Sequence, residues 1–299
     1  MKRLLALLTS LAAAALVPAV AAPAAQADPG GCPSMYVVAV PGTWETSNGG
    51  SPGPGLLSGV TGGLPSSVQT DYVTYSATAF PWETEVYGRS KAQAVNGAKA
   101  LLKGMADRCA STDLALVGYS QGADAAGDVA AEIGTGLGVV PADRMAAVGL
   151  ISDPRRSPSD VQIGARVVGA GVGGARIGGF GWISDKVVTI CAVGDLYCST
   201  PQDDFVSRFA GFLGQISGTA PGQFGQFQQE AQSIFNDLMA AGGLPTLMSQ
   251  LDEPSNDERI QKLEQFYGST VHQDYATYPV DGAGTSATAW MQNWLRGKI

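Results

Sequence analysis

The sequence predicts an α/β protein in which a mostly parallel sheet is covered by helices on both faces. Short, continuously apolar segments recur along the chain, and each has the length of a buried strand. Longer segments between them carry apolar residues at every third or fourth position, as amphipathic helices do. Strands that alternate with helices indicate parallel pairing, because each crossover helix returns the chain to the same edge of the sheet.

The elements follow one another in a regular order along the body of the chain. In chain order we expect strands at 35–40 and 72–75, a Gly-, Ser- and Pro-rich loop at 46–67, helices at 91–105 and from 121 to about 133, and strands at 114–117, 145–151 and 187–190. Residues 200–268 differ, since Gly and Pro separate short amphipathic helices there, the last at 257–267. This region is predicted to be a helical insertion in the α/β body, and a final helix at 286–295 closes the chain.

A glycine-dense segment at 164–181 contains Gly169 to Gly174, which formally matches the dinucleotide fingerprint G-x-G-x-x-G. That fingerprint requires a helix directly after it and an acidic residue about twenty positions further on. Neither is evident, so we interpret the segment as a loop whose backbone packs closely or takes positive φ. We expect no nucleotide or other cofactor.

The first residues have the layout of a secretory signal peptide. Lys2 and Arg3 precede an apolar run from Leu4 to Val20, and Ala25-Gln26-Ala27 offers a cleavage site. We expect residues 1–27 to be removed and 28–299 to form one exported domain. Retention of the run as an N-terminal anchor is the alternative, since its length is close to that of a spanning helix.

Charge and cysteine content restrict the partners and the compartment. The formal net charge of −8 argues against nucleic acid, which requires a basic surface, and against electrostatic docking on anionic membranes. Four cysteines in an exported chain indicate disulfides. We favour Cys191 with Cys198, which closes a short loop, and this leaves Cys32 with Cys109. A zinc site is disfavoured, because no C-x-x-C spacing occurs and the chain has a single histidine.

The candidate nucleophile is Ser120 in Gly118-Tyr119-Ser120-Gln121-Gly122. Glycines on both sides allow a strand-to-helix turn tight enough to present the hydroxyl. The pattern alone is weak, because Gly49-Gly50-Ser51-Pro52-Gly53 also matches it. Ser51 has no strand before it and no helix after it, whereas Ser120 has both, so we select Ser120.

His272, the only histidine, is the candidate base, and it follows Ser120 in the chain order of α/β-hydrolases. The acid that orients the imidazole should follow a strand end in a rigid loop. Asp195 follows the strand at 187–190 within the predicted Cys191–Cys198 loop, and we prefer it to Asp153 and Asp185. Backbone N–H groups of Gln121, after the nucleophile, and of Thr43, after the first strand, are the predicted oxyanion donors.

Taken together, these motifs resemble the cutinase family of α/β-hydrolases. The serine pentapeptide, Cys191-x3-Asp195-x2-Cys198, His272-x-x-Tyr275, the Gly42-Thr43-x-Glu45 loop and the cysteines Cys32 and Cys109 stand in that family's order and spacing. The resemblance implies Ser120, Asp195 and His272 as catalytic residues, with Thr43 and Gln121 in the oxyanion hole. Pro41 stands where many members carry arginine, and the stretch from the acid to the histidine is longer than in fungal cutinases.

Two turns are closer to the cutinase-like envelope proteins of mycobacteria and related actinobacteria, namely Pro41 to Glu45 and Asp153 to Arg156. That resemblance implies a lipid esterase with phospholipase or thioesterase activity on long acyl chains. We expect a monomer, and its negative charge means that any contact with envelope lipids would be apolar. An acyltransferase with the same triad and a non-catalytic lipid-binding protein are the alternatives. The insertion could form an acyl-chain groove or simply pack on the body. Arg155 and Arg156 could meet a phosphate head group, but we favour a solvated turn.

Overall fold

The computed structural model of the protein describes residues 31–46, 55–220, 225 and 227–299. The predicted signal peptide at 1–27 lies outside these residues, and so does Ser51 with its G-x-S-x-G pattern. Within the described ranges, no helix is both long enough and apolar enough to span a membrane.

Six parallel strands form a single sheet in the order β2-β1-β3-β4-β6-β5. The strands are β1 (Met35–Val40), β2 (Val68–Tyr72), β3 (Asp113–Tyr119), β4 (Met145–Ile151), β5 (Gln162–Ile163) and β6 (Val187–Ile190). Every residue of β1 and all but the first of β3 are buried. Continuously apolar strands of this kind require cover on both faces of the sheet.

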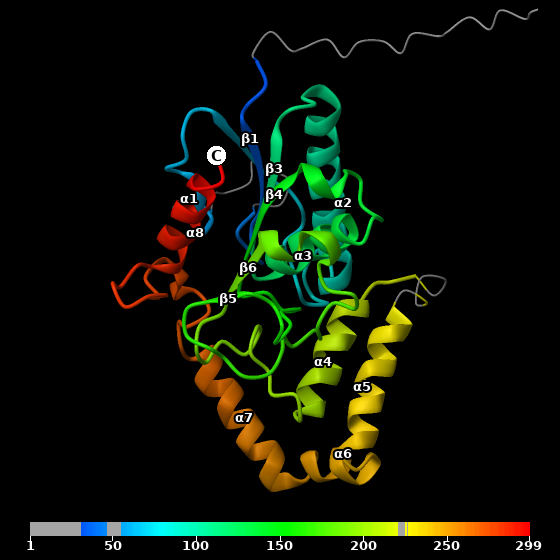
Figure 1. Cartoon of the computed structure of the whole chain (residues 1–299). Helices are drawn as coiled ribbons and strands as arrows, with labels where there is room; N and C mark the ends of the chain where they lie inside the picture. Colours follow the sequence, from blue (N-terminus) through cyan, green and yellow to red (C-terminus); the bar gives the residue numbers. More distant parts are fainter. Residues whose placement is uncertain (1–30, 47–54, 221–224, 226) are drawn as a thin grey trace, which may run out of the picture.

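Helices provide that cover, with α2 and α3 on one face and α1 and α8 on the other (Figure 1). Their bounds are α1 (Ser58–Thr61), α2 (Tyr87–Arg108), α3 (Gln121–Gly134) and α8 (Ala287–Arg296), with 3-10 turns η1 (Ala142–Arg144), η2 (Gly181–Lys186) and η4 (Asp274–Ala276). Ala94, Ala98 and Leu102 lie four residues apart on α2 and are fully buried against the sheet. The predicted α/β architecture is confirmed.

One predicted strand is displaced, because β2 ends at Tyr72 instead of spanning 72–75. β2 pairs with β1, and Tyr72 stands opposite Ala39, one residue from the end of β1. Pro41 follows β1 and has no N–H with which to extend the ladder. After the Val73 N–H binds the Ala39 carbonyl (2.8 Å), the chain therefore leaves the sheet.

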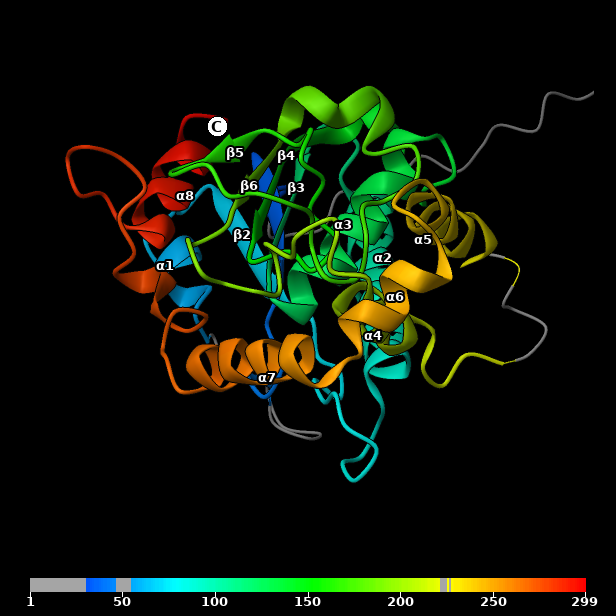
Figure 2. The same ribbon diagram turned by 90° about the horizontal axis from the view of Figure 1, so that it is seen from below.

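The predicted helical insertion consists of α4 (Phe205–Ile216), α5 (Gln228–Ala240), α6 (Leu244–Gln250) and α7 (Glu253–Tyr267). It lies beyond the carboxyl ends of the strands (Figure 1). Within the insertion, α4, α5 and α6 pack against one another and α4 also contacts α2, while α7 lies apart from α4 and α5 (Figure 2). The insertion is thus an arc of helices at the edge where parallel sheets bind their ligands.

The glycine-dense segment has the loop structure expected from the sequence. Gly169 has φ of 70°, and a Cβ placed on it would lie 1.9 Å from the Thr200 carbonyl oxygen. A Cβ on Gly171 would lie 2.2 Å from the Pro154 carbonyl oxygen. No helix opens directly after Gly174, where the dinucleotide fingerprint would require one. The glycines here serve close backbone packing.

Candidate active site

The carboxyl edge of the sheet collects a polar residue from each of four neighbouring strands. Thr43 lies in the loop after β1, Ser120 follows β3, Ser152 follows β4, and Asp195 lies in the loop after β6. Parallel strands end at the same edge, so residues distant in sequence come together there. His272, in the loop after α7, reaches the same place.

Ser120 occupies a strained turn between β3 and α3, with φ of 55° and ψ of −124°. Non-glycine residues rarely adopt this backbone conformation, and such strain concentrates at functional sites. A Cβ on Gly118 would lie 2.4 Å from the Gly122 carbonyl oxygen, and one on Gly122 would lie 2.0 Å from that of Val40. Both motif glycines are therefore required by close backbone contact, as the sequence predicted.

His272 lies between the serine and the acid. Its Nε2 is 2.9 Å from the Ser120 hydroxyl oxygen, and its Nδ1 is 2.9 Å from Oδ2 of Asp195. Aromatic side chains surround the ring, with the Tyr197 ring centroid at 4.6 Å and that of Tyr119 at 5.3 Å. The Tyr119 hydroxyl also donates to the His272 carbonyl, which fixes the backbone of a loop residue. The three residues selected from the sequence thus form one hydrogen-bonded chain.

Asp195 is fully buried and accepts several hydrogen bonds. Its Oδ2 accepts from the Tyr275 hydroxyl (2.7 Å) and the Ser152 hydroxyl (2.6 Å), while Oδ1 accepts from the Tyr197 N–H (3.0 Å). Burial raises the pKa of Asp195, but the bonds from His272, Ser152 and Tyr275 outweigh it and hold the pKa below its usual value. The carboxylate therefore stays ionised beside the imidazole.

The two rival carboxylates lie elsewhere. Asp153 is buried but faces Arg176, whose guanidinium donates to it at 2.6 and 3.1 Å. Asp185 is exposed on η2, which precedes β6 and so lies at the opposite edge of the sheet. Of the three carboxylates, Asp195 is the one that hydrogen-bonds to His272, and the geometry therefore agrees with its choice.

Both predicted disulfides are present. Cys32 is bonded to Cys109, and Cys191 is bonded to Cys198. The second encloses Asp195 in a loop whose ends are only seven residues apart, which restricts how far the carboxylate can move. Disulfides of this kind are typical of proteins that fold in an oxidising compartment.

The predicted oxyanion donors lie on two segments in close contact. Gln121 is the first residue of α3, where backbone N–H groups lack intrahelical acceptors. A Cβ on Gly122 would lie 2.3 Å from the Pro41 carbonyl oxygen, so the Thr43 loop runs directly against this helix start. Among the described residues, the backbone N–H groups of Thr43 and Gln121 have no protein acceptor.

Glu45 shapes the Thr43 loop. Its carboxylate accepts from the Gly42 N–H (2.8 Å) and from the Leu56 N–H (2.7 Å), which ties the loop to the segment before α1. Burial raises the pKa of Glu45 despite these bonds. The sequence marked Glu45 as part of a motif but did not show what the side chain does.

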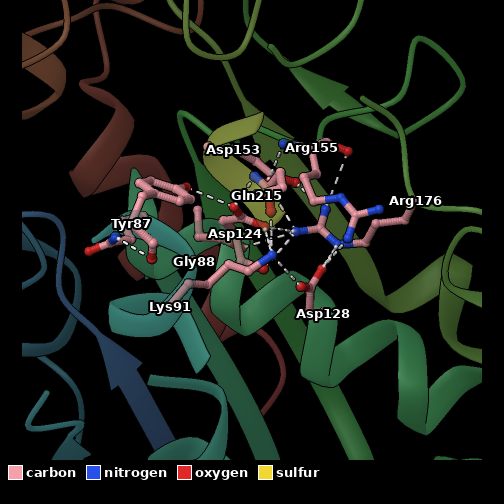
Figure 3. Close-up of polar contacts among 12 residues, drawn as sticks. Tyr87, Gly88, Lys91, Asp124, Asp128, Asp153, Arg155, Arg176 and Gln215 are labelled. Atoms are coloured by element: carbon pink, nitrogen blue, oxygen red, sulfur yellow. Dashed lines mark hydrogen bonds and ion pairs between the residues drawn. The ribbon is translucent and has the colours of Figure 1, made fainter. Parts of the chain in front are cut away.

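The solvated turn expected at Arg155 and Arg156 is wrong, because both side chains are buried. Arg156 donates to the carbonyls of Cys198 (2.8 Å) and Gly169 (2.7 Å). Arg155 pairs with Glu230 and with Asp128 (3.1 Å). Through Asp128 it belongs to a buried charge network that consists of Lys91, Asp124, Asp128, Asp153, Arg155 and Arg176 (Figure 3). Both guanidinium groups therefore bind acceptors within the protein. The contact of Arg156 with the Cys198 carbonyl joins residues 42 positions apart, and no local sequence pattern predicts such a contact.

Two further residues at the site were given no role by the sequence. Tyr275 and Ser152 both donate to Asp195, and Tyr275 was marked only through the spacing His272-x-x-Tyr275. Ser152 belongs to no motif, and its position depends on a backbone φ of 53° that side-chain patterns do not reveal. In the described part of the chain, no cluster of His, Cys, Asp and Glu side chains could hold a metal ion.

This geometry agrees with comparisons to known proteins. The sequence profile of the family described as Cutinase matches residues 31–210. The chain belongs to the cutinase family. A Corynebacterium glutamicum protein named carboxylesterase Culp6 homolog is 33% identical over 210 residues, which are 58% of this chain and 67% of that protein. Phospholipase Culp4 of Mycobacterium tuberculosis is 31% identical over 224 residues, 71% of this chain and 86% of that protein. This cutinase-family chain is an ester hydrolase.

A solved structure extends the similarity in fold into the insertion. Lysin B from mycobacteriophage D29 superposes with a TM-score of 0.51 at 18% identity, covering 88% of this chain and 99% of that one. This coverage is greater than residues 31–210 can supply, so the likeness continues beyond residue 210. At this identity, the likeness concerns the fold alone.

Proposed function

We propose that this cutinase-family enzyme hydrolyses lipid-like acyl esters by a serine acyl-enzyme mechanism. Ser120 is the nucleophile, His272 the general base, and Asp195 the acid that orients the imidazole. The observation that carries this proposal is the continuous chain of hydrogen bonds from the Ser120 hydroxyl through His272 to Asp195, with 2.9 Å at each of its two links. The substrate is a small ester molecule, and no cofactor takes part.

The first half-reaction follows from this arrangement. The Ser120 oxygen attacks the ester carbonyl carbon while its proton passes to Nε2 of His272. Backbone N–H groups of Thr43 and Gln121 stabilise the oxyanion of the tetrahedral intermediate. When the C–O bond to the alcohol breaks, Nε2 returns the proton to the leaving oxygen. A water molecule then attacks the acyl-enzyme by the same steps and releases the carboxylic acid.

A serine variant tests the mechanism. Ser120→Ala should keep the wild-type fold while losing ester turnover and covalent labelling by a fluorophosphonate probe. Ser184→Ala is the matched control, because Ser184 is an exposed serine on η2 at the opposite edge of the sheet. Normal labelling of Ser120→Ala would show that another residue is the nucleophile.

The preference for lipid-like acyl groups is supported by the position of α7. Phe266 of α7 is buried edge-on against Tyr197 (5.3 Å between ring centroids) and lies 6.3 Å from the His272 ring. The insertion thus contributes an aromatic wall beside the base. An acyl chain that leaves the carbonyl on this side would meet apolar carbon, which favours longer chains.

Chain-length profiles test this role of the insertion. Phe266→Ala should lower kcat/KM for long-chain esters more than for short-chain esters, by roughly tenfold in the ratio for one lost aromatic contact. Phe235→Ala is the control, because Phe235 is 52% exposed on α5 and is not among the described aromatic residues that surround His272. An unchanged ratio in a folded Phe266→Ala variant would contradict an acyl-binding role for α7.

We also propose that the enzyme is exported, with residues 1–27 acting as a signal peptide and 28–299 as the mature cutinase-like domain. The two disulfides support folding in an oxidising compartment. N-terminal sequencing of the protein recovered outside the cell should begin at Asp28. An N-terminus that retains Leu4 to Val20 would favour the anchored alternative.

A further inference from the structure

Ser152 occupies a central place in the site although no motif includes it. It follows β4, is fully buried, and lies between the acid and the base. Its hydroxyl oxygen is 2.6 Å from Oδ2 of Asp195 and 3.1 Å from Nδ1 of His272. The three side chains therefore form a closed hydrogen-bonded triangle.

The chemistry of this triangle determines where the protons lie. An ionised Asp195 can only accept, so the single Ser152 hydroxyl proton is donated to Oδ2. The Ser152 oxygen then presents a lone pair to Nδ1 of His272, as Asp195 does. Two acceptors around Nδ1 require that this nitrogen carries the proton. Nε2 is left unprotonated and can accept the proton of Ser120.

The backbone at Ser152 is strained in a way that glycine would avoid. Its φ of 53° is left-handed, where most side chains are disfavoured. The conformation is held on both sides, by the Ser152 N–H bound to the Ile190 carbonyl (2.8 Å) and by the ion pair between Asp153 and Arg176 (Figure 3). The presence of serine here, in place of the less strained glycine, indicates that its hydroxyl is used.

We propose that Ser152 is a positioning residue for the catalytic base. Its hydroxyl holds the His272 ring in plane with Asp195 and maintains the Nδ1-protonated tautomer during turnover. This inference rests on the proposed function, because it assigns a role to Ser152 only if His272 is the base that activates Ser120.

Two substitutions of Ser152 separate the effect of its hydroxyl from the effect of its backbone strain. Ser152→Gly removes the hydroxyl and relieves the left-handed strain, whereas Ser152→Ala removes the hydroxyl and keeps the strain. Both variants should lose roughly tenfold in kcat and in the rate of fluorophosphonate labelling, as expected for one hydrogen bond, while KM stays within about twofold. Loss of the hydrogen bond to Asp195 should lower the melting temperature of Ser152→Ala, whereas relief of the strain offsets that loss in Ser152→Gly.

A spectroscopic measurement supplies a readout that stability does not affect. His272 is the only histidine, so the imidazole resonances of uniformly ¹⁵N-labelled protein report this ring alone. The Nδ1–H resonance of Ser152→Gly should shift from its wild-type position, since one of its two acceptors is gone.

The outcomes are distinguishable. Equal loss of kcat in both variants with a shifted Nδ1–H resonance supports the positioning role. Wild-type kcat and an unshifted resonance in Ser152→Gly would overturn it, as would a loss confined to the strained Ser152→Ala. If Ser120→Ala were still labelled normally, the proposed function would fail, whatever the Ser152 variants show.

Discussion

Replacement of Arg176 by Met should destabilise the fold strongly, because Arg176 is the centre of the buried charge network. Its side chain is 4% exposed, and its guanidinium donates to Asp153 (2.6 and 3.1 Å), to Asp128 (2.9 Å) and to the Asp124 carbonyl (2.8 Å). Removal of one partner from a buried ion pair typically costs about 3–5 kcal/mol. Burial already raises the pKa of Asp153, so this carboxyl can be protonated when Arg176 is absent, which limits the loss. We therefore expect about 3 kcal/mol.

Urea unfolding at neutral pH measures this change, and the melting temperature should fall by roughly 6–12 °C. Lys103→Met is the matched control, because Lys103 pairs with Asp107 (2.8 Å) on an exposed turn of α2. Exposed pairs of this kind contribute less than about 0.5 kcal/mol. A loss in Arg176→Met no larger than in Lys103→Met would refute the reasoning that burial makes the network essential.

Three further predictions follow from the same network and from the site. Burial raises the pKa of Asp128, but Lys91, Arg155 and Arg176 outweigh it and lower the pKa below 3.8. Its stabilisation is therefore fully present above the usual pKa of 3.8 and is lost gradually as the pH falls from there toward the lowered pKa. The difference in unfolding free energy between wild type and Asp128→Asn should be about 3 kcal/mol at pH 7 and should shrink below pH 3.8. A difference that is constant with pH in urea titrations would contradict this. Gly122→Ala should lose about 3 kcal/mol or more, because its Cβ would lie 2.0 Å from a carbonyl oxygen, whereas Gly282→Ala, with open space around it, should melt normally. Replacement of Cys191 and Cys198 by Ser should cost about 2–3 kcal/mol for this short loop and lower kcat at temperatures where both proteins are folded, because Asp195 gains freedom.

The candidate site shows which catalytic residues can be predicted from local sequence patterns. Ser120 was selected over Ser51 by its strand-to-helix setting, and this setting is what gives the hydroxyl its strained backbone. Asp195 was selected by its place after a strand and between two cysteines, and both features are local in sequence. His272 needed no pattern, because the chain has no other histidine.

The residues that the sequence missed depend on contacts between distant segments. Arg156 could not be placed from its Asp153-Pro154-Arg155-Arg156 turn, because its acceptors are backbone carbonyls of other loops. Any residue offers a carbonyl, so such a partner leaves no trace in the side-chain pattern. The strand predicted at 72–75 lies too far along the chain, because β2 is Val68–Tyr72. Its end depends on where its distant partner β1 ends, and the sequence of β2 alone does not show this.

The sequence by itself determined the parallel α/β body and the order of the catalytic candidates, because apolar periodicity and Gly-bounded turns are local properties of the chain. It also determined both disulfides, because the short Cys191–Cys198 spacing is local and leaves only Cys32 to pair with Cys109. Only the tertiary structure decided that Ser152 lies between Asp195 and His272, that Arg176 joins three carboxyl-bearing residues, and that α7 returns Phe266 to the side of the base. Each of these depends on a backbone angle or on a long-range contact, and both are fixed only when the whole sheet and its insertion have packed together.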